Sequence, residues 1–88
     1  GCICRGYCMS CVNLHMTTFP AISLWQRAVI FRKNKLYMWR KVGEQFHVMF
    51  YLDLASNQIG SLGKRSFESF KTLFALDISN NKLRMIKK

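Results

Sequence analysis

Two segments of this chain carry the same pattern of apolar residues, 24 positions apart. Residues 49–59 (MFYLDLASNQI) align without a gap on residues 73–83 (LFALDISNNKL). Both fit L-x-x-L-x-L-x-x-N-x-L, and an apolar residue follows each Asn by five positions, at Leu62 and Ile86. Repetition at this spacing predicts a solenoid, because each unit can bury its apolar side only against its neighbours.

A third, weaker copy lies upstream. Residues 29–36 (VIFRKNKL) place apolar side chains at similar offsets from Asn34, and Trp39 follows that Asn by five positions. Asn34 precedes Asn57 by 23 residues, which is within the usual range for such a repeat. Gln26 stands where the other two copies have Met or Leu, so we interpret this copy as an atypical first repeat.

The alternating part of the pattern predicts a short strand with one buried face. In the second copy, Leu52 and Leu54 point inward and Asp53 points outward. The following Asn57 ends the strand, where its side chain can hydrogen-bond backbone groups of the turn. Return segments of constant length bring the next strand alongside in parallel. The predicted scaffold residues are Asn34, Leu52, Leu54, Asn57, Leu76, Ile78 and Asn81.

Over about residues 11–86, the pattern resembles the leucine-rich repeat family. The resemblance implies an α/β solenoid with short parallel β-strands, irregular or 3₁₀ return segments and an N-terminal disulfide cap. The implied divisions are a cysteine-rich cap over residues 1–20 and repeats over 21–88. The repeats divide into an atypical unit at about 21–42, then 43–66 and 67–88.

Residues 11–20 (CVNLHMTTFP) resemble the end of this family's extracellular N-terminal cap. There a Cys precedes a small hydrophobic strand and then Leu-Thr-x-Ile/Phe-Pro, with Met16 in the Leu position here. Pro20, the only proline, fixes a bend between the cap and the first repeat.

All four cysteines lie within the first eleven residues. They could form local disulfides, which would indicate a secreted or extracellular chain, or could hold one zinc ion as thiolates. Their spacing, C-x-C-x3-C-x2-C, is not that of common zinc modules and favours disulfides. The family cap pairs its first cysteine with its third and its second with its fourth. The resemblance therefore implies bridges Cys2–Cys8 and Cys4–Cys11.

In this family a ligand lies against the concave strand face, which implies one set of binding residues. They are Ile30, Arg32, Lys33, Tyr51, Asp53, Ala55, Asp77 and Ser79. Asp is common at its position in the family, so a scaffold role for Asp53 and Asp77 is favoured over ligand contact. On neighbouring strands about 4.8 Å apart, these like charges would need a cation or solvent.

The formal net charge is +10, and much of it is concentrated in one stretch. Its basic residues are Arg27, Arg32, Lys33, Lys35, Arg40 and Lys41, interleaved with Trp25, Tyr37 and Trp39. This composition suits an anion-binding module for heparin-like glycan or nucleic acid. The other interpretation, a solvated edge of the fold, is favoured slightly.

The resemblance implies non-enzymatic protein–protein recognition, in the N-terminal part of an extracellular receptor, adhesion or matrix protein. No G-x-S-x-G, P-loop or HExxH motif occurs, so we expect no catalysis, cofactor or metal. No apolar run reaches the length of a membrane span. We expect a protein ligand, and a sulfated glycan as a second partner. The last repeat would present an open apolar end, which we expect further repeats or another chain to cover.

Overall fold

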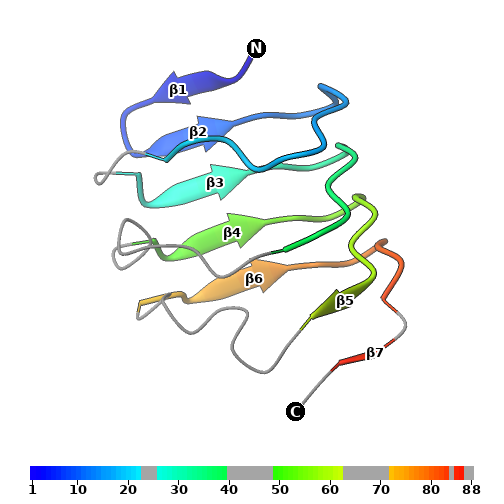
Figure 1. Ribbon diagram of the computed structural model, residues 1–88. Coiled ribbons are helices and arrows are strands. Elements are labelled where there is room, and N and C mark those ends of the chain that lie inside the picture. The colour runs from blue at the N-terminus through cyan, green and yellow to red at the C-terminus, as the bar shows by residue number, and fades with distance from the viewer. Residues whose placement is uncertain (23–25, 40–48, 63–71, 84, 87–88) are drawn as a thin grey trace.

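The computed structural model describes residues 1–22, 26–39, 49–62, 72–83 and 85–86. Five short strands form one sheet in the order β1-β2-β3-β4-β6 (Figure 1). They are β1 (Ile3–Arg5), β2 (Cys8–Ser10), β3 (Ala28–Ile30), β4 (Tyr51–Asp53) and β6 (Ala75–Asp77). A second, two-stranded parallel sheet pairs β5 (Ser61–Leu62) with β7 (Met85–Ile86). None of the described residues is helical.

The register of the parallel strands follows the sequence repeat. Leu52 lies opposite Leu76 in the β4–β6 pair, and Val29 lies opposite Leu52 in the β3–β4 pair. The 24-residue alignment is therefore confirmed, and so is the 23-residue alignment of the weaker copy. β2 extends this parallel series toward the N-terminus, with Met9 opposite Val29. Much of the return path, at 40–48 and 63–71, lies outside the described residues, so the predicted 3₁₀ segments are not tested there.

Each repeat Asn links its own turn to the preceding one. The buried Asn57 side chain accepts a hydrogen bond from the Leu36 N–H (3.0 Å) and donates to the carbonyls of Phe31 (2.8 Å) and Leu54 (3.0 Å). Asn34 and Asn81 make the equivalent bonds one turn earlier and one turn later. Buried backbone groups that no strand pairs are satisfied in this way, which confirms the predicted role of Asn.

The residue before each of these asparagines has a left-handed backbone. Lys33, Ser56 and Asn80 have φ values of 60°, 58° and 54°, and Asn13 has 56° at the equivalent place in the cap. This conformation turns the chain sharply out of the strand, and it disfavours residues other than Gly, Asn and Asp. In Figure 1 the resulting turns lie one below another on the right of the sheet.

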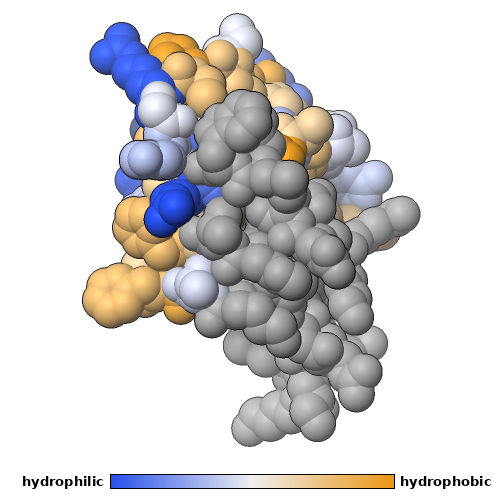
Figure 2. Space-filling view, turned by 90° about the vertical axis from the view of Figure 1, so that its left-hand side faces the viewer, coloured by the Kyte–Doolittle hydropathy of each residue, from blue (hydrophilic) through white to orange (hydrophobic). Residues whose placement is uncertain are grey.

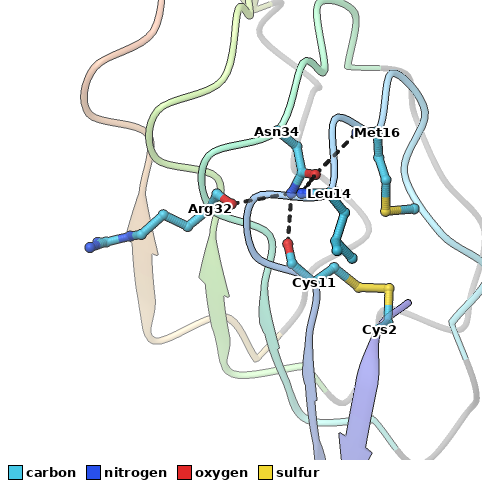
Figure 3. The surroundings of a disulfide bond; sticks show 6 residues. All are labelled: Cys2, Cys11, Leu14, Met16, Arg32 and Asn34. Carbon is cyan, nitrogen blue, oxygen red and sulfur yellow. Dashed lines mark hydrogen bonds between the residues drawn. A yellow bond between two sulfur atoms is a disulfide. The ribbon is translucent and has the colours of Figure 1, made fainter.

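The cap is an antiparallel hairpin of β1 and β2, with Ile3 opposite Ser10. This register brings Cys2 to Cys11, and the two form a disulfide with their Cα atoms 4.4 Å apart (Figure 3). The pairing implied by the family, Cys2–Cys8 and Cys4–Cys11, is therefore wrong: Cys4 and Cys8 are free thiols.

Alternation along the hairpin gives the physical reason. Cys4 lies opposite Met9 and Cys8 opposite Arg5, so the two free cysteines face opposite sides of the hairpin. The hydrophobic strand expected after Cys11 is also absent from the described residues. The cap strand ends at Ser10, and Asn13 and His15 both have positive φ.

The core lies behind the sheet, between the strands and the return segments. It includes Val29, Phe31, Leu52 and Leu54, all fully buried. Trp39 also belongs to the core, and its ring meets that of Phe19 edge-on, with the ring centroids 5.2 Å apart. At the end of the sheet the burial is incomplete: Leu76 is 38% exposed, whereas Leu52 at the same register is 0% exposed.

We predict that Asn57→Ala lowers the free energy of unfolding by about 3 kcal/mol, because it leaves the Leu36 N–H and the Phe31 carbonyl without their partner in the core. Asn81→Ala is the matched control, since the same substitution there affects a half-buried site. Urea unfolding measures both. An equal loss of unfolding free energy at the two positions would show that burial does not make the hydrogen bonds of Asn57 more stabilising than those of Asn81.

Two thiols should react with an alkylating reagent after denaturation without reductant, and peptide mapping should recover Cys2 joined to Cys11. All four cysteines lie among the described residues, so this count tests the hairpin register directly. No reactive thiol would mean a second bridge, and four would mean that the cap is held by packing alone.

Candidate binding surfaces of the sheet

One face of the five-stranded sheet is turned away from the core, and we call it the open face. By alternation from the buried Val29 and Leu52, it carries Ile30, Tyr51, Asp53 and Asp77. Ala55 and Ser79 follow on the same side after the strands end. The residues predicted from the sequence to bind a ligand therefore share one side of the sheet, but Asp53 and Ala55 are buried there, at 3% and 2% exposed. The exception is Lys33, which lies in the turn beyond β3.

Arg32 joins the two aspartates of the open face. Its Nε lies 3.1 Å from Asp53 Oδ2, and its Nη2 donates a hydrogen bond to Asp77 Oδ2 over 3.3 Å. The Nε contact is an ion pair without hydrogen-bond alignment. The cation that the stacked aspartates need is thus supplied by the chain itself. We call Arg32, Asp53 and Asp77 the charge clamp.

The aspartates also stabilise their own turns, as the scaffold interpretation expects. Asp53 Oδ1 accepts a hydrogen bond from the Ala55 N–H at 2.9 Å. Asp77 Oδ1 accepts from the Ser79 hydroxyl and N–H at 2.6 and 2.9 Å. These bonds, followed by the charge of Arg32, hold the pKa of Asp77 below its ordinary value of 3.8. The ionised carboxylate therefore contributes stability above pH 3.8, which is lost as the pH falls through the lowered pKa.

A column of large side chains stands beside the open face, at the residue just before each parallel strand. Backbone hydrogen bonds link Arg27 to Tyr7, Phe50 to Arg27 and Phe74 to Phe50, so the four lie in sequence across the strands. Tyr7, Phe50 and Phe74 are 63%, 47% and 89% exposed. The Arg27 guanidinium lies over the Tyr7 ring, 5.2 Å from its centroid. We call these four residues the aromatic column.

Figure 2 looks onto the end of the sheet at which the parallel strands begin. Apolar side chains stand out there at the surface among hydrophilic ones. Phe50 precedes β4, which has a strand on either side, so its exposure is not a consequence of an open sheet edge. The sequence pattern gave no signal for this column. The family motif assigns no role to the position, and only the strand register aligns its members.

The described members of the predicted basic cluster do not form one patch. Arg27 is at the start of β3 beside Tyr7, Arg32 belongs to the charge clamp, and Lys33 and Lys35 are exposed in the turn at the other end of the strand. Arg40 and Lys41 lie outside the described residues. Only Lys33 and Lys35 remain as neighbouring unpaired cations within the described part of this stretch.

A hollow of about 370 Å³ opens on the opposite side of the fold, between the return segments of the cap and the first repeat. Its lining is Thr17, Thr18, Phe19, Leu36, Tyr37, Met38 and Trp39. None of these seven residues is a His, a Cys or a carboxylate.

Within the described part of the chain, no three His, Cys, Asp or Glu side chains are placed to share a metal ion. The thiolate zinc site considered above is incompatible with the Cys2–Cys11 bridge, which uses two of its four ligands. Among the described segments, none is a helix with the length and apolar character to cross a bilayer. No protein-family model matches the chain, and no curated protein sequence matches it.

We predict that Arg32→Gln destabilises the fold by about 2 kcal/mol, because it leaves the buried Asp53 carboxylate without its cation. Adding Asp53→Asn to this variant should restore part of the loss, since the amide oxygen still accepts from Ala55 without carrying a charge. Thermal or urea unfolding of the single and the double variant measures both changes in stability. If the double variant is less stable than Arg32→Gln alone, Asp53 acts only through its turn.

Proposed function

We propose that this chain is a leucine-rich repeat segment of an extracellular receptor, adhesion or matrix protein, and that it recognises another protein without catalysis. The register of 23 and 24 residues supports the family assignment, together with the hydrogen bonds of Asn34, Asn57 and Asn81. The Cys2–Cys11 disulfide supports a location outside the cytosol.

The observation that carries the binding proposal is the aromatic column beside the open face. Exposed Phe and Tyr side chains have an unfavourable contact with water, and such residues dominate the binding energy of protein interfaces. The charge clamp supports a rigid surface next to them, because its three side chains are held by one another and by their turns. A protein partner would bury Phe50, Phe74 and Tyr7 and contact Tyr51 on the open face.

The outer edge of β6 supports a second contact. β6 ends the five-stranded sheet, and Leu76 there is partly exposed at a position that is fully buried in β4. A further repeat, or a second chain, adding a parallel strand at this edge would cover it.

The binding proposal is tested with the chain immobilised against a panel of purified extracellular domains. A ligand of the aromatic column should lose at least tenfold in affinity with Phe50→Ala combined with Phe74→Ala, since each buried Phe contributes about 1.5–3 kcal/mol. Tyr37→Ala is the matched control, because Tyr37 is a comparably exposed aromatic (58%) that lies beside the hollow. Equal losses in the two variants, or none, would contradict the assignment of the surface.

A further inference from the structure

The turns at the other end of the strands form a second surface, distinct from the aromatic column and the open face. In each turn, one residue precedes the Asn position and one follows it. Backbone hydrogen bonds connect these turns, from Lys35 to Met16, from Gln58 to Leu36 and from Lys82 to Ile59. The eight flanking residues are Asn13, His15, Lys33, Lys35, Ser56, Gln58, Asn80 and Lys82.

All eight are polar, three are lysines, and none is acidic or apolar. Lys33, Lys35 and Lys82 are exposed, and none of them pairs with a carboxylate among the described residues. The two described carboxylates, Asp53 and Asp77, are both engaged by Arg32 at the open face. We call these eight positions the turn ridge.

The three lysines are close enough to act together. Lys33 and Lys35 flank one Asn, and Lys82 lies two turns along, about 10 Å away at the spacing of neighbouring strands. This separation is near the Debye length at physiological ionic strength, so their potentials add at the surface. Neutral amide and hydroxyl side chains fill the positions between them and can donate hydrogen bonds to an anion.

We propose that the turn ridge binds a sulfated polysaccharide, which runs across the turns with its sulfate groups on Lys33, Lys35 and Lys82. The absence of Phe, Tyr and Trp among the eight positions favours this partner over single-stranded nucleic acid, which needs a stacking platform. The absence of apolar ones disfavours insertion into a lipid surface. The disulfide in the cap is consistent with a compartment where such glycans occur.

This surface was not visible as a motif, because Lys82 is far from Lys33 and Lys35 in sequence. The turn ridge includes Lys33 and Lys35 of the predicted basic cluster, and its third lysine, Lys82, lies outside that cluster. The glycan proposal does not depend on the proposed protein recognition, which uses the opposite ends of the strands. Either proposal can therefore fail alone.

The test measures binding of the whole chain to heparin by calorimetry at about 0.15 M salt. Lys35→Gln with Lys82→Gln should weaken binding about tenfold, because each exposed cation–sulfate contact contributes roughly three- to fivefold. Arg5→Gln is the charge control for Lys82→Gln alone, since it removes one positive charge from an exposed site at the other end of the strands. It should change the affinity less than threefold. Adding Lys33→Asn, which suits the positive φ, should weaken binding further.

Desulfated heparin and an oligothymidylate serve as competing probes. The proposal is supported if heparin alone binds, if added salt weakens binding steeply, and if the ridge variants reduce it. Equal losses of affinity with Arg5→Gln and with Lys82→Gln would show that only net charge matters, and would overturn the assignment. Absence of heparin binding at this salt, or tighter binding of the oligothymidylate through the same lysines, would overturn it as well. Unchanged melting temperatures confirm that each variant is folded.

Discussion

The buried hydrogen bonds of Asn57 are the constraint on which the arrangement of this chain depends. A strand of three residues pairs few backbone groups, and the sharp turn after it would leave others unpaired in the core. One side chain that accepts from Leu36 and donates to Phe31 and Leu54 satisfies groups of two neighbouring turns together. The register between turns is fixed as a result, because a slip of one residue would break all of these bonds.

A fixed register converts single positions in the sequence into continuous surfaces. The position before each strand becomes the aromatic column, and the positions that flank each Asn become the turn ridge. Between these two ends lies the charge clamp, with Asp53 in β4, Asp77 in β6 and Arg32 just after β3. Apolar and basic surfaces thus lie at opposite ends of the same strands, so one partner at each end could bind without displacing the other.

The sequence was sufficient for features that repeat and insufficient for contacts that occur once. The strands, their register, the inward Leu52 and the turn bonds of Asn57 follow from periodicity and side-chain chemistry. The disulfide pairing depends on the hairpin register of β1 and β2, for which no periodic signal exists. Arg32 meets Asp53 and Asp77, 21 and 45 residues away, and only the stacked strands bring them together. Gln26 was noted as an exception in an apolar position; its Nε2 lies 3.0 Å from Cys4 Sγ beneath the hairpin.

The direction of the asparagine bonds makes the two ends of the sheet unequal. Each Asn donates to a carbonyl of the turn before it, so the last of them, Asn81, is satisfied by Leu54 and by its own turn without any successor. At the first turn no Asn is needed, and Leu14 takes that position and gives its N–H to Asn34 (Figure 3). The Asn81 side chain thus has its hydrogen bonds within the described repeats, whereas apolar burial at this end of the sheet is incomplete, since Leu76 is partly exposed. A partner that adds a strand at the β6 edge would therefore also gain apolar contact with Leu76.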